Sequence, residues 1–292
     1  MKIAFIGTGV MGGPMAINLL KNGHEVRVNT RTRAKAEEVL SAGGTWADSP
    51  AEAADGADAA IGIVGLPAEV EKIFLGDQGL LAANQVPGVV IDMATSPPSL
   101  ARQIDKVARE RGAGFLDAPV SGGDVGAIKG TLSIMVGGEQ KDFDTMLPAF
   151  EAMGATVVHQ GPAGSGQRTK LANQILVAVH TMATAEALLF AKRAGLDGAT
   201  VIKSIGSGAA GSWAINQLGP RMLQEDYDPG FMIHHLVKDL RIATGEIDEL
   251  GLELPSLKQA LEYFELAVEK DMGHLGTQAL ILVLHEMNHQ TP

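Results

Sequence analysis

The sequence predicts a two-domain α/β protein, with a mostly parallel sheet covered by helices over residues 1–163 and an all-helical domain over residues 164–292. A length of 292 residues suits two domains, at roughly 100 to 200 residues each. Strand and helix patterns alternate through the first half. Only helical patterns follow the glycine-rich segment at 161–166.

Short apolar runs mark the strands of the first half. They lie at residues 2–6, 24–29, 59–64, 89–93, 115–117, 132–136 and 156–158. Helical spacing of apolar residues between these runs predicts helices at 14–21, 34–40, 68–74 and 99–111. Such alternation with short connections is typical of a parallel sheet that helices cover on both faces.

The second half carries helical patterns alone. A long apolar pattern predicts one helix from residue 167 to 194, and shorter helices are expected at 200–205, 214–222, 233–250 and 256–269. We expect no strand beyond residue 158. The boundary between the domains is therefore placed near Gly164.

Composition excludes several classes of protein. The chain has no cysteine, which rules out a disulfide scaffold, a Cys-ligated metal site and a thiol nucleophile. Its formal net charge of −11 argues against nucleic-acid binding, which needs clustered Lys and Arg. No segment reads as a membrane span or an export signal, so we expect a cytoplasmic protein that binds no membrane.

A glycine-rich turn joins the first strand to the first helix and reads Gly7-Thr8-Gly9-Val10-Met11-Gly12, the pattern G-x-G-x-x-G. The first glycine permits the tight turn, the second lets the backbone approach a pyrophosphate, and the third lets the helix pack closely on the strand. N–H groups at the start of the helix hold the phosphates. The pattern is weak by itself, but its place between a strand and a helix predicts a Rossmann-type dinucleotide-binding domain.

The end of the second strand indicates which dinucleotide binds. NAD sites usually carry an acid about 20 residues beyond the glycines. This strand instead ends in Asn29-Thr30-Arg31-Thr32-Arg33, with no acid before Glu37. Because an arginine pairs with a 2′-phosphate, Thr30 and Arg31 are expected to favour NADP(H), with NAD(H) possible. The alternative is that Arg31 and Arg33 are solvated residues at the start of a helix.

Turns after other strands lie at the carboxyl edge of the sheet, where open α/β folds bind ligands. One turn carries Leu66 and Pro67, and another carries Thr95 and Ser96. Thr95 offers a hydroxyl, whereas Ser96 fits an ordinary helix cap equally well. The segment Ser121-Gly122-Gly123 offers a hydroxyl and backbone N–H groups that suit a carboxylate, although a flexible loop fits it as well.

Three polar residues share one face at the start of the long helix. Lys170, Asn173 and Gln174 are spaced i, i+3 and i+4, and the residues after them are apolar on all sides. Most lysines are solvated surface residues. A lysine beside two amides at the start of a buried helix is more typical of a functional site.

These motifs together resemble the β-hydroxyacid dehydrogenase family over nearly the whole chain. The resemblance rests on residues 5–12 with 15–20, on 117–123, on 164–174, and on Gly230-Phe231 with Lys238-Asp239-Leu240. It implies an NADPH-dependent oxidoreductase that reduces a small aldehyde or 2-oxo acid, such as glyoxylate or succinic semialdehyde, to the hydroxy acid. The implied reaction is hydride transfer with a lysine as acid–base group, and the implied assembly is a homodimer or homotetramer.

The resemblance also implies roles for individual residues. Lys170 matches the catalytic lysine, and the segment Ser121-Gly122-Gly123 matches the loop that binds the substrate carboxylate. Thr95 matches a residue beside the nicotinamide and the substrate, and Lys238 matches one that closes over the cofactor. The other matches, which line the substrate cleft, are Asn173, Gln174, Phe231 and Asp239. Many family members have Asn at the position of Gln174, so the substrate pocket is expected to differ.

Rival activities fit part of this pattern. An NAD(H)-dependent 3-hydroxyisobutyrate or tartronate semialdehyde enzyme is one alternative, and a non-catalytic NADP-binding sensor is a different class. Imine reductases generally carry Asp or Tyr in place of the lysine, so Lys170 argues against that activity. His234 and His235 have no carboxylate at zinc-ligand spacing, so we expect no metal site.

Overall fold

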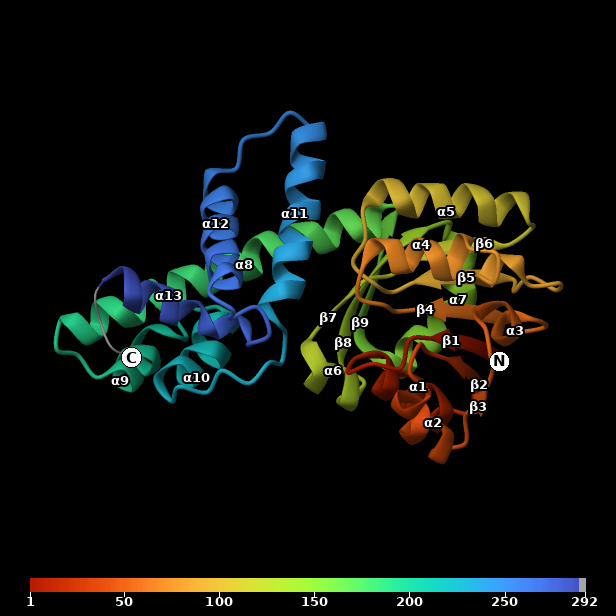
Figure 1. The fold of residues 1–292 in the computed structure, drawn as a ribbon, viewed down its shortest axis with the longest axis horizontal. Coiled ribbons are helices and arrows are strands. Elements are labelled where there is room, and N and C mark those ends of the chain that lie inside the picture. Colours follow the sequence, from red (N-terminus) through yellow and green to blue (C-terminus); the bar gives the residue numbers. More distant parts are fainter. Residues whose placement is uncertain (289–292) are drawn as a thin grey trace. The chain divides into compact units, whose positions relative to one another are not determined.

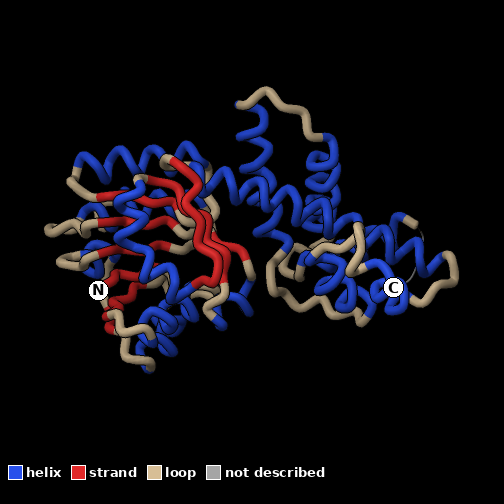
Figure 2. Tube along the Cα trace, turned by 180° about the vertical axis from the view of Figure 1, so that it is seen from behind, coloured by secondary structure: helices blue, strands red, loops and turns tan. Residues whose placement is uncertain are grey.

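The chain folds into two compact units, residues 1–170 and residues 171–292 (Figure 1). The structure is a computed structural model that describes residues 1–288. All the named strands belong to the first unit, and the second unit consists of helices and connecting loops (Figure 2). This confirms the predicted fold class, a Rossmann-type mostly parallel sheet domain followed by helices.

The first unit is built on a nine-stranded sheet with the order β3-β2-β1-β4-β5-β6-β8-β7, in which β9 also pairs with β8. The strands from β1 to β6 run parallel, β8 is antiparallel to β6 and β7, and β9 is parallel to β8. Their bounds are β1 Lys2–Ile6, β2 Glu25–Asn29, β3 Thr45–Trp46, β4 Ala59–Gly62, β5 Val89–Asp92, β6 Gly114–Asp117, β7 Val120–Ser121, β8 Leu132–Gly138 and β9 Gly154–Gly161.

Helices cover both faces of this sheet, and each face has its own apolar core. The first core includes side chains of α1 (Gly12–Lys21), α2 (Glu37–Ser41), α6 (Gly123–Lys129) and α7 (Gln140–Met153). The second core includes those of α3 (Pro50–Ala54), α4 (Pro67–Leu75) and α5 (Pro98–Glu110). The central strands are buried on both faces, which explains their continuous apolar runs.

The structure differs from the sequence prediction where an element is short or interrupted. The helix expected at 34–40 is a 3₁₀ turn, η1 (Arg33–Ala36), followed by α2. The two-residue strands β3 and β7 were not predicted, because only their pairing with neighbouring strands defines them. Helix α7 was also missed. It contains Pro148, a residue that normally ends a helical pattern.

The second unit is helical, and its apolar core joins α8, α11, α12 and α13. Helix α8 (Ser165–Arg193) begins in the first unit and continues in the second. The segment predicted as one helix at 214–222 is a π turn, η3 (Ala214–Leu218), and then α10, because Gly219-Pro220 interrupts the pattern. The remaining elements are α9 Gly198–Ile205, α10 Gly219–Leu223, α11 Ile233–Glu249, α12 Pro255–Glu269, η4 Thr277–Ala279 and α13 Leu280–Met287.

Helix α8 is also long and apolar enough, by length and composition alone, to cross a membrane. From the sequence we expected no such segment. Half of the most apolar window of α8 is buried inside the protein, and the core helix of a soluble protein passes the same test. The property is therefore weak evidence for a membrane span.

The turn between β1 and α1 depends on two glycines that leave no room for a side chain. Gly7 has φ +98°, a conformation that L side chains rarely adopt. A Cβ added at Gly12 would lie 1.9 Å from the carbonyl oxygen of Gly7 and 2.9 Å from Cγ2 of Ile63. By contrast, a Cβ at Gly9 would meet no atom within 4 Å. The start of α1 is thus pressed against β1 at Gly12, while the backbone at Gly9 faces open space.

We therefore expect Gly12→Ala to lower the free energy of unfolding by about 3 kcal/mol, since the added methyl must push α1 away from β1. Gly9→Ala is the matched control and should keep the wild-type stability within about 0.5 kcal/mol. Urea unfolding followed by circular dichroism measures both. Equal losses in the two variants would contradict the close packing at Gly12.

Candidate functional site

The turn after β1 has the features of a phosphate site. The backbone at Gly9 has open space around it, and α1 begins three residues later with its N–H groups at the helix start. The hydroxyl of Thr8 is buried and has no hydrogen-bond partner among the described residues. The side chain of Val10 in this turn is 68% exposed. An open backbone and an unsatisfied buried hydroxyl fit the pyrophosphate of a dinucleotide.

Arg31, two residues beyond β2, pairs with an acid that the sequence analysis did not single out. Its guanidinium Nη1 lies 2.9 Å from Oε1 of Glu69, and the Arg31 side chain is 85% exposed. The other carboxylate oxygen of Glu69 accepts hydrogen bonds from the N–H groups of Gly65 and Leu66, each at 3.2 Å. The start of α4 therefore fixes Glu69 and leaves one of its oxygens directed at Arg31.

Other residues of interest lie in the turns after β2 and β4. Leu66 is 50% exposed, and Pro67 is the first residue of α4. Thr30 directly follows β2, whose last residue, Asn29, donates its side-chain amide to the carbonyl of Ala47. The guanidinium of Arg33 lies over the ring of Trp46, 5.0 Å from its centroid, so it contacts an aromatic face rather than Glu69.

The turn after β5 is held by buried hydrogen bonds. Asp92, the last residue of β5, is fully buried and accepts bonds from the Ser96 hydroxyl and from the N–H of Ala94. The N–H of Ser96 donates to Oε1 of Gln167 at 3.0 Å. Thr95 lies between these anchored residues at the carboxyl end of the strand. Ser96 is thus part of a buried polar network with Asp92 and Gln167, and its role goes beyond that of an ordinary helix cap.

Lys170 lies against the segment that follows β6. Its ammonium Nζ donates to the carbonyl oxygen of Val120 at 2.8 Å, and the residue is 7% exposed. Ser121 ends the short strand β7, and α6 begins at Gly123, so the segment predicted to bind a carboxylate is a strand-to-helix junction rather than a flexible loop. Gly122 and Gly123 have φ +133° and +65°, which favours glycine at both positions.

A buried carboxylate fastens the start of α8 to the end of β6. Asp117 is the last residue of β6 and is 0% exposed. Its two oxygens accept the N–H groups of Gly164 and Gln167, each at 2.7 Å. Burial raises the pKa of Asp117 to about 6, and the N–H donors at the start of α8 oppose that rise. The carboxylate is therefore ionised at neutral pH and stabilises the amino-terminal end of the helix.

The first unit contains three of the predicted segments. Thr95 follows β5, Ser121 ends β7 and is followed by Gly122 and Gly123, and Lys170 of α8 contacts Val120 of β7. A hydroxyl, a pair of glycine N–H groups and an ammonium in one region of a protein suit the binding of a small anionic molecule.

The other predicted residues belong to the helical unit and form a chain of hydrogen bonds there. Asn173 donates its amide to Oε1 of Gln174 at 2.8 Å, and Gln174 donates its own amide to Oδ2 of Asp239 at 2.5 Å. The ammonium of Lys238 lies 2.7 Å from the other oxygen of Asp239. Asp239 is 2% exposed, and the ammonium of Lys238 balances the charge of this buried carboxylate within the unit. Phe231 takes no part in this series of hydrogen bonds, and its ring stacks on that of His235.

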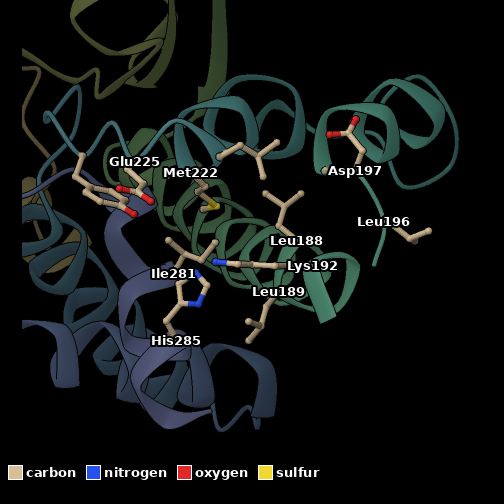
Figure 3. A pocket seen from close by; sticks show the side chains of 12 residues that line it. Leu188, Leu189, Lys192, Leu196, Asp197, Met222, Glu225, Ile281 and His285 are labelled. Carbon is tan, nitrogen blue, oxygen red and sulfur yellow. The ribbon is translucent and has the colours of Figure 1, made fainter. Parts of the chain in front are cut away.

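The helical unit also contains a cavity of about 270 Å³ far along α8 from Lys170 (Figure 3). Leu188, Leu189 and Lys192 of α8 line it together with Ile281 and His285 of α13. None of the predicted site residues lines this cavity. Within residues 1–288, no group of three or more His, Asp or Glu could hold a metal ion.

Sequence reasoning missed the residues that connect the predicted segments. Glu69 reads as a helix-capping acid, Asp92 as the end of a strand, and Gln167 as the first turn of a helix. A polar residue that directly follows a continuous apolar strand run, as Asp92 does, is a signal that could have found one of them. Nothing in the sequence indicates that Arg31 and Glu69, or Gln167 and Ser96, meet.

The raised pKa of Asp117 predicts a pH dependence of stability. Between about pH 6 and pH 4 the folded state binds a proton at Asp117 that the unfolded state, with an ordinary Asp pKa, does not bind. The contribution of this residue to the free energy of unfolding therefore rises as the pH falls. Relative to Asp117→Asn, the wild type should gain about 1 kcal/mol between pH 7.5 and pH 5. Urea unfolding of both proteins at the two pH values measures the difference, and a constant difference would contradict the raised pKa.

Comparison with known protein families agrees with the geometry of both units. Residues 2–161 match the NAD binding domain of 6-phosphogluconate dehydrogenase. Residues 164–284 match the family described as NAD-binding of NADP-dependent 3-hydroxyisobutyrate dehydrogenase. The two matches together span most of the chain.

Individual relatives are similar over the same length. A probable 3-hydroxyisobutyrate dehydrogenase-like protein of Arabidopsis thaliana is 43% identical, over 99% of this chain and 86% of its own length. The 2-hydroxy-3-oxopropionate reductase of Escherichia coli is 37% identical, over 99% of both chains. The structure of Mycobacterium tuberculosis 3-hydroxyisobutyrate dehydrogenase with L-serine has a TM-score of 0.87 at 32% identity and covers 97% of this chain and 98% of that chain.

The glycine turn after β1, the residues at the carboxyl ends of β5 and β6, and these matches along most of the chain agree with one another. The chain belongs to the β-hydroxyacid dehydrogenase family and is an NAD(P)-dependent oxidoreductase that acts on CH–OH groups.

Proposed function

We propose that the protein is an NADPH-dependent reductase of a small aldehyde acid or 2-oxo acid, such as glyoxylate or succinic semialdehyde. Residues 1–163 form the NADP-binding domain and residues 164–292 the helical domain for substrate binding and oligomerisation, of which 289–292 lie outside the described residues. The observation that carries the proposal is the position of Lys170. Its buried ammonium lies against the Asp117–Gly123 segment, 2.8 Å from the Val120 carbonyl.

The cofactor is held by the turn after β1 and by the turns after β2 and β4. The backbone of residues 7–12 binds the pyrophosphate, since Gly9 leaves it open and the hydroxyl of Thr8 lacks a partner among the described residues. Thr30 and Arg31 would hold the 2′-phosphate, and Leu66 and Pro67 would form another part of the cofactor site. Thr95 would lie beside the nicotinamide, and Lys238 would close over the cofactor. When bound, NADPH supplies the hydride.

The chain's own residues position the substrate and supply the proton. Ser121 and the N–H groups of Gly122 and Gly123 bind the substrate carboxylate, which fixes the carbonyl carbon. The ammonium of Lys170 donates a proton to the aldehyde oxygen as that oxygen becomes an alkoxide. The alkoxide becomes a hydroxyl, and Lys170 is left as a neutral amine that accepts a proton from water. In the oxidation direction the neutral amine takes the proton of the hydroxyl.

The helical unit sets the fit of the rest of the substrate. Asn173, Gln174, Phe231 and Asp239 line this part of the pocket in our proposal. Both polar groups of the Gln174 side chain are engaged, by Asn173 and by Asp239. A substrate hydroxyl that reaches Gln174 must therefore exchange for one of these bonds. We propose that this is how the chain discriminates among acids with different substituents.

A second candidate function is the reduction of tartronate semialdehyde or the oxidation of 3-hydroxyisobutyrate with NAD(H). The Escherichia coli relative is named for 2-hydroxy-3-oxopropionate, which is tartronate semialdehyde, and the Mycobacterium tuberculosis structure contains L-serine, a small acid with a β-hydroxyl group. A non-catalytic sensor of NADP is the alternative from a different class. We further propose a cytoplasmic homodimer or homotetramer.

A substrate panel tests this proposal against its rivals. Glyoxylate, succinic semialdehyde, tartronate semialdehyde and 3-hydroxyisobutyrate are each assayed with the phosphorylated and the non-phosphorylated cofactor, by absorbance at the nicotinamide band. We expect Lys170→Ala to lower kcat by about 1,000-fold or more, through loss of the proton donor and its charge. NADPH affinity, measured by fluorescence titration, should stay within about threefold, because Lys170 does not hold the phosphates. A variant that keeps a tenth of the wild-type kcat would exclude the proton-transfer role.

Cofactor preference should depend on Arg31 and Glu69. Arg31→Ala should lower the ratio of kcat/KM for NADPH to that for NADH by about 10- to 100-fold, through loss of a charge-assisted bond to the 2′-phosphate. Glu69→Gln should raise the same ratio several-fold. It removes a carboxylate that competes for the guanidinium and repels the phosphate.

Arg33→Ala is the matched control, because the guanidinium of Arg33 packs on Trp46 and should leave the ratio unchanged. A strong preference of the wild-type protein for NADH would overturn the role given to Arg31.

A further inference from the structure

Gln167 is a buried residue that bonds to two of the segments proposed to surround the substrate. Its exposed fraction is 0%, and it lies in the first turn of α8, one turn before Lys170. Its carbonyl Oε1 accepts the N–H of Ser96 at 3.0 Å, and its amide Nε2 donates to the carbonyl of Ala94 at 2.9 Å. Both neighbours of Thr95 in the chain are therefore attached to the Gln167 side chain.

The backbone of Gln167 is attached to the next strand. Its N–H donates to Oδ2 of Asp117 at 2.7 Å, and Asp117 lies opposite Asp92 in the pairing of β5 with β6. The backbone at this junction is closely packed. A Cβ on Gly166 would lie 2.4 Å from the carbonyl oxygens of Asp117 and Met135. The start of α8 is thus pressed onto the sheet at the same point where Gln167 bonds to the turn after β5.

The environment selects an amide at this position. Nε2 of Gln167 also lies 3.3 Å from the carboxylate of Asp92, so a Glu would place a second carboxylate beside a buried one. A Glu would also lack the N–H that the Ala94 carbonyl accepts. An apolar side chain of the same length would leave the Ser96 N–H and the Ala94 carbonyl without their buried partner.

We infer that Gln167 is a positioning residue that sets the distance between Thr95 and Lys170 by fastening the Ala94–Ser96 turn to the start of α8. The inference rests on the proposed function, in which Lys170 donates the proton and Thr95 lies beside the reacting group. Because Gln167 is 0% exposed, we assign it no contact with substrate or cofactor. It acts through the two residues it holds, because a small displacement of a catalytic group from its reacting partner lowers the rate steeply.

The test compares Gln167→Met and Gln167→Glu with Thr169→Val, a control in the same helical turn. The hydroxyl of Thr169 bonds to Ser165 and Gln160 and does not reach the Ala94–Ser96 turn. With the substrate that the wild type turns over, we expect both Gln167 variants to lower kcat by about 10- to 100-fold. Their KM for NADPH should stay within about threefold, and the kinetic isotope effect from NADPH deuterated at C4 should increase. The control should behave like the wild type.

A measurement that does not depend on activity separates this inference from the proposed function. The Ser96 amide should exchange with deuterium at least about tenfold faster in Gln167→Met than in the wild type, since its acceptor is gone, and at the wild-type rate in Thr169→Val. If the wild type reduces no substrate of the panel, the proposed function fails while this readout still reports on the turn. Unchanged exchange, an unchanged isotope effect, or loss of the folded state in both Gln167 variants would overturn the inference.

Discussion

The carboxylate of Asp117 is the interaction on which the start of α8, and with it the position of Lys170, depends. It is fully buried, and a buried charge is costly unless hydrogen bonds compensate for it. The N–H groups of Gly164 and Gln167 supply those bonds, and they are groups that a helix start leaves without intrahelical partners. One carboxylate therefore satisfies the start of α8 and fixes it to the end of β6, and the position of Lys170 follows from that attachment.

Parallel strands then bring the remaining groups to one edge. The turns after β1, β2, β4, β5 and β6 all leave the sheet at the carboxyl ends of the strands, so residues far apart in the chain become neighbours. At one part of this edge Arg31 meets Glu69, and at another Gln167 meets the turn that carries Thr95. The glycine turn after β1 adds an open backbone at Gly9. The chemistry of the family is thus distributed over short turns on a rigid sheet.

Much of the fold and several candidate site residues could be predicted from local sequence patterns. Gly7, Gly9 and Gly12 are recognisable because only glycine permits the positive φ, the open backbone and the close helix packing that the turn requires. Lys170 stood out because it lies beside the amides Asn173 and Gln174 at the start of an apolar helix. Helix α7 was missed because Pro148 interrupts its helical pattern. Strands β3 and β7 were missed because only their pairing with neighbouring strands defines them.

The sequence by itself determined the fold class and the family, and it singled out the glycine turn and Lys170 as candidate site residues, because each depends on residue types at short spacing. Only the tertiary structure decided which side chains meet. It paired Arg31 with Glu69, linked Gln174 to Asp239, and placed Gln167 between the ends of β5 and β6. These contacts join residues that are far apart in the chain. Their geometry depends on strand order, helix packing and the burial of polar groups, none of which has a local signature.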